Sequence, residues 1–204
     1  GLVGSEMCIR DSTKTVDATS LTTNAGGTVV IKGGRITTSS TQSYGENMVL
    51  DNSAHATVLN TTNSAVIITG TVNNQTGEAA QSLTVDAGTG SVLFSEMIGD
   101  QGGIGDLVVK SAGVTGVTTF TKAVTASTLT TDQGGTVVIK GGRVTTAGAQ
   151  HYGDSVLLAN AGHATVLTTT NAPVTLTGTV NNQTVGTPES LTVNAGSGAV
   201  LFSE

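Results

Sequence analysis

The sequence predicts an all-β fold, a parallel β-solenoid in which the chain winds around one long axis in roughly nine coils. Short runs of alternating apolar and polar residues fill the chain from Thr13 onward, with glycine, asparagine and aspartate between them. No window has apolar residues at helical spacing over three turns. Comparable strands, such as those at Leu83, Leu107 and Leu129, recur about every 20–24 residues. Coils of about 21 residues, stacked in parallel, would give a rod about 40 Å long.

The strongest regularity is a tandem repeat. The run GGTVVIKGGR occupies Gly26–Arg35 and returns unchanged at Gly134–Arg143, an offset of 108 residues. At this offset, residues 13–96 match residues 121–204 at about 53 of 84 positions. Residues 97–120 form an intervening coil. We therefore expect 13–204 to be a single solenoid domain made of two repeat copies and that coil.

The segment 1–12 does not belong to the repeat. Its run EMCIRD resembles a translated sequencing adapter, and we expect the segment to be non-native. A signal-peptide remnant is the alternative, but the segment lacks an apolar region of the required length. Its Cys8, the single cysteine, therefore predicts no thiol chemistry. The chain stops at Glu204, the repeat position of Glu96, so we expect a fragment of a longer protein.

Each expected strand is a short alternating run that ends at a turn signal. In chain order, strands are expected around Leu21, Val29 to Ile31, Ile36, Val49, Val58, Val66 to Ile68, Leu83 to Val85, Val92 to Phe94, and Leu107 to Val109, and again in the second copy. Apolar residues that recur at the repeat offset should point inward. These are Val29, Ile31, Val85, Val92 and Phe94, with their counterparts Val137, Ile139, Val193, Val200 and Phe202. Asparagines at the turns, such as Asn73 and Asn74, are expected to form amide ladders between coils.

The composition excludes several classes of partner. The net charge is −6, only 11% of residues are charged, and lysine and arginine form no run, which argues against nucleic acid. No apolar stretch approaches the length of a membrane span, so no membrane insertion is expected. Aromatic residues are 2% of the chain, which favours a narrow interior of small and β-branched side chains.

Three runs carry a resemblance to a known family. Thr145–Leu158, Thr177–Thr184 and Ser190–Phe202 resemble the repeats of filamentous-haemagglutinin-type bacterial surface proteins, which include large adhesins and autotransporter-like passengers. The resemblance covers 13–204. It implies a right-handed parallel β-helix, export across a Gram-negative envelope by secretion machinery that acts on regions outside this sequence, and display or release at the cell surface.

The candidate catalytic residues recur with the repeat. His55 and His163 occupy one repeat position, as do Lys32 and Lys140. An active site is usually built once, so the histidines are expected to be structural, and the lysines to form solvated outer pairs with Arg35 and Arg143. A carbohydrate-active site would need carboxylates and a base on adjacent coils. The acids Asp51, Glu78 and Asp86 are replaced in the second copy by Ala159, Gly186 and Asn194. Because nearly every other charged residue recurs, we expect no unique charged cluster and no catalytic residue.

Other binding chemistries have little support. The run Gly99–Asp106 is a single, imperfect copy of a Gly/Asp calcium nonapeptide, so a turn is expected and no metal site. No phosphate-binding loop occurs, and no cofactor is predicted. The sequons at Asn74 and Asn182 are expected to be turns. Thr175, Thr177 and Thr179 alternate as in an ice-binding face, but the first copy has Ile67 at the first of these positions.

These observations predict a non-catalytic rod-like spacer of an extracellular bacterial adhesin. Its outer threonine, asparagine and glutamine rows would bind a host or neighbouring-cell glycan or protein, weakly per coil and more strongly by repetition. A carbohydrate-active β-helix enzyme and an ice-binding solenoid are the alternatives.

Overall fold

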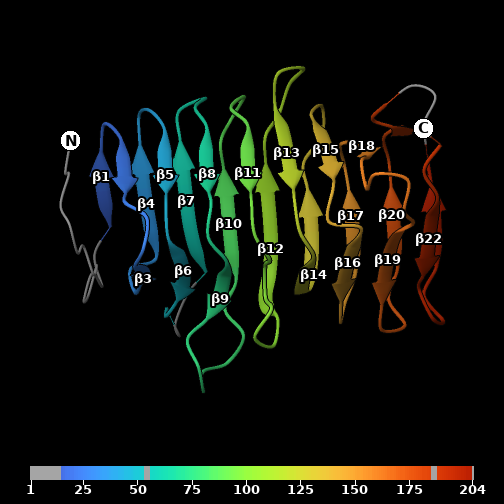
Figure 1. The fold of residues 1–204 in the computed structure, drawn as a ribbon, viewed down its shortest axis with the longest axis horizontal. Helices are drawn as coiled ribbons and strands as arrows, with labels where there is room; N and C mark the ends of the chain where they lie inside the picture. The colour runs from blue at the N-terminus through green and yellow to red at the C-terminus, as the bar shows by residue number, and fades with distance from the viewer. Residues whose placement is uncertain (1–14, 53–55, 185–187, 204) are drawn as a thin grey trace.

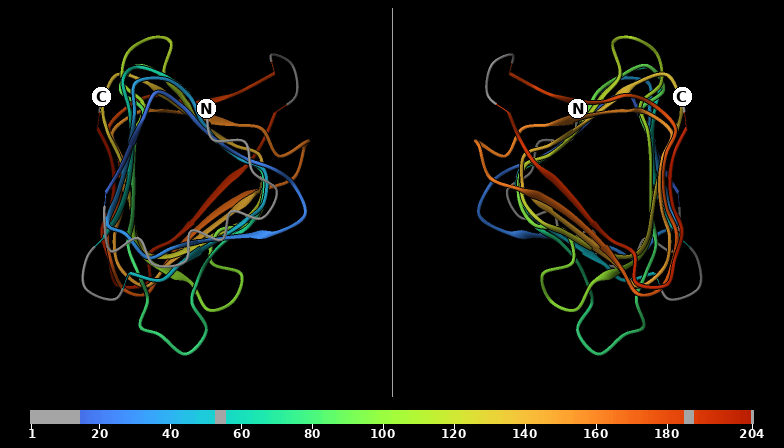
Figure 2. Two further views of the ribbon diagram at one scale, coloured as in Figure 1. Left: turned by 90° about the vertical axis from the view of Figure 1, so that its left-hand side faces the viewer. Right: turned by 90° about the vertical axis from the view of Figure 1, so that its right-hand side faces the viewer.

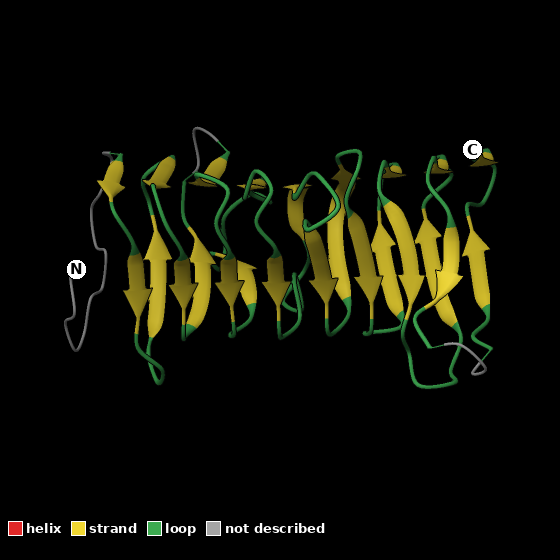
Figure 3. Ribbon diagram, turned by 90° about the horizontal axis from the view of Figure 1, so that it is seen from above, coloured by secondary structure: helices red, strands yellow, loops and turns green. Residues whose placement is uncertain are grey.

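The computed structural model describes residues 15–52, 56–184 and 188–203, and their regular structure consists of strands without any helix (Figure 3). The strands stack along one axis, with β1 and β22 near opposite ends of the rod (Figure 1). The predicted all-β solenoid is therefore confirmed. The segment 1–12 and His55 lie outside the described residues.

Each turn of the solenoid has three sides when the rod is viewed along its axis (Figure 2). Strand β14 (Val124–Thr131) passes a corner and belongs to two faces. Face 1 contains β1 (Val16–Ala18), β4 (Arg35–Thr38), β7 (Thr57–Thr61), β10 (Leu83–Asp86), β12 (Ile104–Lys110), the second half of β14 (residues 129–131), β17 (Gln150–Tyr152), β20 (Val174–Leu176) and β23 (Val200–Phe202). Face 2 contains β2 (Leu21–Thr23), β5 (Gln42–Tyr44), β8 (Val66–Ile68), β11 (Val92–Phe94), β13 (Val117–Phe120), β15 (Thr136–Ile139), β18 (Ser155–Leu158) and β21 (Val180–Asn182). Face 3 contains β3 (Thr28–Ile31), β6 (Asn47–Leu50), β9 (Val72–Asn74), the bridging residue Ile98, the first half of β14, β16 (Arg143–Thr146), β19 (Thr165–Thr169) and β22 (Leu191–Asn194).

Every strand pair among the described residues is parallel. The register places inward residues of one turn opposite inward residues of the next turn. Leu83 pairs with Leu107, and Leu107 pairs with Leu129, as their spacing in the sequence predicts. The described residues complete eight turns, and β23 begins a ninth. Turns are longer on average than the predicted 21 residues because some corners carry long loops, such as the one between β9 and β10.

The interior is a continuous column of buried side chains. Val29, Ile31, Val85, Val92 and Phe94 are each at most 1% exposed, so their predicted inward direction is confirmed. In the second copy Val137 and Ile139 are equally buried, and Val193 packs against the core. In β23 the side chains of Val200 and Phe202 are 43% and 57% exposed, because no described strand covers that side of the last turn.

The interior also contains a polar pair that the sequence analysis did not predict. The side chains of Gln42 and Tyr44 are fully buried, and the Tyr44 hydroxyl donates to Gln42 Oε1 over 2.8 Å. Gln42 Nε2 donates to the carbonyl oxygens of Ile36 and Asn60 at 3.2 and 2.8 Å. The second copy repeats the pair with Gln150 and Tyr152, at 2.9 Å. Each buried amide is thus satisfied by backbone from two turns, which offsets its desolvation.

Candidate functional site

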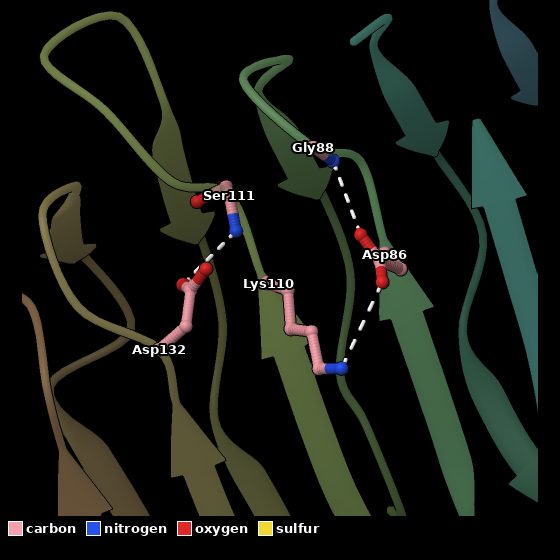
Figure 4. Close-up of polar contacts among 5 residues, drawn as sticks. All are labelled: Asp86, Gly88, Lys110, Ser111 and Asp132. Carbon is pink, nitrogen blue, oxygen red and sulfur yellow. Dashed lines mark hydrogen bonds and ion pairs between the residues drawn. The ribbon is translucent and has the colours of Figure 1, made fainter. Parts of the chain in front are cut away.

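Three charged residues form a column on face 1, at the junction between the two repeat copies (Figure 4). Asp86 and Lys110 end the neighbouring strands β10 and β12 and are directly paired in register. Asp132 follows β14 on the next turn. Lys110 Nζ lies 3.7 Å from Asp86 Oδ2, and Asp86 Oδ1 accepts a hydrogen bond from the backbone N–H of Gly88 at 3.2 Å. The expectation that no unique charged cluster exists is therefore wrong.

The sequence contains a signal for this column that was missed. Asp86, Lys110 and Asp132 are 24 and 22 residues apart, which is one turn each. Lys110 belongs to the intervening coil, and the two acids are replaced at their repeat positions by Asn194 and Asn24. A comparison of the two copies does not reveal such a cluster, because the cluster occurs where the copies differ.

The third acid is tied to the turn before it. Asp132 Oδ1 accepts a hydrogen bond from the backbone N–H of Ser111 at 3.1 Å. Burial raises the pKa of Asp132, and the negative charge of Asp86 raises it further, while the Ser111 hydrogen bond and the Lys110 charge lower it. Asp132 thus links two turns through a carboxylate in a partly desolvated position.

A fourth acid, Asp154, lies one further turn along the same edge. It is 1% exposed, and its Oδ1 accepts a hydrogen bond from the backbone N–H of Gly135 at 2.8 Å. Its Oδ2 is buried without a hydrogen-bond partner. Burial raises the pKa of Asp154 to about 6, and the charge of Asp132 acts in the same direction. This carboxyl group therefore binds a proton at a higher pH than an exposed aspartate does.

A row of carboxylates with an ammonium group can in principle perform acid–base chemistry. In this column, however, Asp86 and Asp132 are each engaged by a backbone N–H, and Lys110 faces Asp86. The surface hollows described next are lined by other residues. The arrangement is therefore suited to tie successive turns together.

The larger hollow lies at the corner where face 3 meets face 1, beside loops that project from the triangle in Figure 2, and the smaller hollow extends from it across the outer side of face 3. Two adjoining pockets, of about 160 and 390 Å³, share Asn74, Gln75, Thr76 and Gln101. Their linings carry amide and hydroxyl groups and one carboxylate, that of Glu78. Such a lining offers hydrogen bonds to a neutral polar ligand but no aromatic stacking surface.

The asparagines at this corner bind backbone, which corrects the expected ladder of stacked amides. Asn74 Oδ1 accepts from the N–H of Gln81 at 2.8 Å, and Asn74 Nδ2 donates to the carbonyl of Gly103 on the next turn. In the second copy Asn182 Oδ1 accepts from the N–H of Glu189 at 3.0 Å. This recurrence in both copies indicates a structural role for the two sequon asparagines.

Within the described part of the chain, His163 and the recurring basic residues lie at separate places on the surface. His163 is exposed in a turn, where its backbone N–H donates to the carbonyl oxygen of Asn160. Lys32 lies at a partly exposed outer position and forms an ion pair with Asp51 at 3.2 Å, which the sequence analysis did not predict. Arg35, Lys140 and Arg143 are exposed on outer positions.

Among the residues that the structure describes, the calcium-like run and the threonine run do not form the binding sites that their sequences suggest. In the run Gly99–Asp106, Gly99, Gly102 and Gly103 have positive φ and form a turn before β12. Within 15–52, 56–184 and 188–203 no group of three or more His, Cys, Asp or Glu side chains could hold a metal ion. Thr175 points outward on face 1, whereas the Thr177 hydroxyl donates to the carbonyl of Tyr152 at the corner, so the Thr175–Thr179 run is not a flat array.

Comparison with protein-family models, with curated proteins and with solved structures finds no match for this chain. No helix within the described part of the chain is long and apolar enough to cross a membrane.

Proposed function

We propose that this chain is a non-catalytic, rod-like segment of a secreted bacterial surface adhesin of the filamentous-haemagglutinin type, which holds a binding region away from the cell. The observation that supports the proposal is the stack of parallel strands that continues along faces 1 and 2 through eight turns, with a buried core in every turn. A stack of this kind extends about 4.8 Å per turn and resists bending, as a spacer requires. Its outer faces present hydroxyl and amide groups to a glycan or protein.

Inter-turn contacts also support a mechanical role. Asn63 adopts a left-handed backbone with φ of 53°, and its Oδ1 accepts from the N–H of Thr89 on the next turn at 3.0 Å. Asn171 and Ser197 repeat this contact at 3.0 Å in the second copy. The column of Asp86, Lys110 and Asp132 adds charged links across the junction. Selection for a rod would retain such contacts in each copy.

The same charged column is the specific observation that favours the rival function, a carbohydrate-active β-helix enzyme. The two are separated by incubating the chain with a panel of polysaccharides and measuring new reducing ends. We expect no release above a protein-free control. Release that disappears in Lys110→Met and Asp132→Asn, but persists in the exposed control Asp100→Asn, would replace the spacer function by catalysis.

The adhesive part of the proposal is tested by binding of the purified chain to an array of neutral and acidic glycans. Because few charges lie on the outer faces, we expect weak binding to neutral glycans that changes little with salt. Binding confined to acidic glycans and abolished by moderate salt would contradict a surface of hydroxyl and amide groups.

A further inference from the structure

The sequence repeat does not correspond to a whole number of turns. Between the start of β1 and the start of its counterpart in β14, the described chain contains the thirteen strands β1–β13 and the bridging residue Ile98. These fourteen strand positions, distributed over three faces, make four turns and two further strands. The second copy therefore begins on a different face from the first.

The strand pairings show this displacement directly. β1, β4, β7 and β10 lie on face 1, but their sequence counterparts, the first half of β14, β16, β19 and β22, stack on face 3. Likewise β3, β6 and β9 lie on face 3, and their counterparts β15, β18 and β21 lie on face 2. Equal sequence positions are thus rotated by one third of a turn about the rod axis.

The junction strand β14 shows the displaced start of the second copy. Val124 bridges to Ile98 on face 3, whereas Leu129–Thr131 pair with Leu107–Val109 on face 1. The alternation of buried and half-buried residues along β14 breaks at Ser127 and Thr128, where the strand passes the corner between the two faces. One strand therefore serves two faces, and it carries counterparts of both β1 and β2.

Outer side chains follow the same rotation. The identical decamers place Lys32 to Arg35 at the corner between face 3 and face 1, but Lys140 to Arg143 at the corner between face 2 and face 3. A flat partner surface that contacts one of these corners does not contact the other. Repetition along the sequence thus does not build a single repeated binding face.

We infer that the repeat is displayed as a screw, so that its repeated outer groups bind separate partner molecules arranged around the rod. This inference rests on the proposed adhesive function only for the statement that the outer groups bind. Avidity requires that linked sites reach their partners simultaneously. In the two copies of this chain, equivalent outer groups lie on different faces, so a single flat surface does not meet that requirement for both copies.

Disulfide crosslinking tests the geometry independently of any binding. With Cys8→Ser as background, Val108→Cys and Thr130→Cys place two outward cysteines on paired positions of face 1. Neighbouring parallel strands lie about 4.8 Å apart, within the Cα separations of about 4.4–6.8 Å that a disulfide accepts. We expect this pair to crosslink, as measured by loss of free thiols and mobility on a non-reducing gel.

The alternative, a whole number of turns, would place the counterpart of β1 next to β12, and hence Thr125 next to Val108. The pair Val108→Cys with Thr125→Cys should therefore remain reduced. The pair Thr125→Cys with Thr145→Cys adjoins in either arrangement and serves as the positive control. Crosslinking of Val108→Cys to Thr125→Cys, or of the control pair alone, would overturn the screw.

Electron microscopy tests the display itself. Arg35 and Arg143 are exposed counterparts at the starts of β4 and β16. A variant with biotin at Arg35→Cys and Arg143→Cys, decorated with streptavidin, should show labels projecting in directions one third of a turn apart. Labels aligned on one side of the rod would exclude display around it. Failure of the chain to bind any glycan, with the labels still rotated, would instead remove the adhesive function alone.

Discussion

The rings of Phe94 and Phe120 stack inside the rod on consecutive turns, with centroids 5.4 Å apart and planes inclined by 13°. The two residues end β11 and β13 and are paired in register. Phe94 belongs to the first repeat copy and Phe120 to the intervening coil. The aromatic contact therefore joins the repeat to the segment that separates the copies.

Truncation of Phe94 should be strongly destabilising. Its side chain is 1% exposed, so Phe94→Ala removes the stack and leaves a cavity, at a cost of about 3–5 kcal/mol. Phe202, its counterpart, is 57% exposed, and Phe202→Ala should cost far less. Urea unfolding of both variants measures the difference. Equal losses would mean that Phe202 is covered in solution.

Substitution of Gly88 should be more harmful than substitution of Gly77. Both residues have positive φ, 58° and 85°, so either alanine variant incurs the backbone cost of about 1–2 kcal/mol. A Cβ at Gly88 would also overlap Asn63 Oδ1, the group that links two turns, whereas a Cβ at Gly77 meets no atom within 4 Å. We expect Gly88→Ala to lower the free energy of unfolding by about 1–3 kcal/mol more than Gly77→Ala. Thermal unfolding of the two variants compares them. Equal decreases in the melting temperature would show that the Asn63 side chain moves aside at little energetic cost.

Asp154 should make the rod less stable as the pH rises. Its folded pKa of about 6 lies above the ordinary aspartate value of 3.8, so the folded state binds the proton more tightly than the unfolded state. The resulting stability is complete below about pH 4 and is lost as the pH rises through about 6. The loss is on the order of 1–3 kcal/mol. Asp132, whose pKa is also raised, contributes in the same direction.

Urea unfolding at pH 4.5 and pH 7.5 checks the Asp154 prediction. Asp154→Asn cannot ionise, so its stability should change less between the two pH values than that of the parent chain. The exposed substitution Asp100→Asn is the matched control and should retain the full dependence. A parent chain that becomes more stable between pH 4.5 and pH 7.5 would show that the Asp154 carboxylate is better accommodated than its burial indicates.

The ion pair of Lys110 and Asp86 should contribute little to stability. Its side chains are 48% and 33% exposed, so solvent screens their attraction. A double-mutant cycle with Lys110→Met and Asp86→Asn should give a coupling of about 0–1 kcal/mol, smaller at high salt. A coupling well above this range would indicate that the column is a principal link across the junction.

Hydrogen exchange should be slowest in the middle of the rod. Amides of β10 to β15 donate within ladders covered by turns on both sides, whereas β23 pairs only with β20. We expect exchange to accelerate from β15 toward Phe202. Protection in β23 equal to that in β12 would indicate that another chain covers the last turn.

Residue alternation and spacing are sufficient to predict the solenoid and its interior. Alternation places Val29, Ile31 and Phe94 inward because side chains in a strand point to opposite faces in turn. The spacing of Leu83, Leu107 and Leu129 gave the length of the turn. The same alternation also marks Gln42 and Tyr44 as inward, but a buried glutamine is expected only once its backbone partners are known.

The residues of different turns that share a face are known only from the folded structure. Repeat identity preserves local pairing: Val124 pairs with Val144 as Val16 pairs with Ile36. The face on which the second copy begins depends instead on the number of strand positions in the first copy and the intervening segment together. One of these is Ile98, a single bridging residue with no alternation of its own. Because fourteen positions do not divide evenly among three faces, the copies rotate, and Asp86, Lys110 and Asp132 form a column that repeat comparison could not predict.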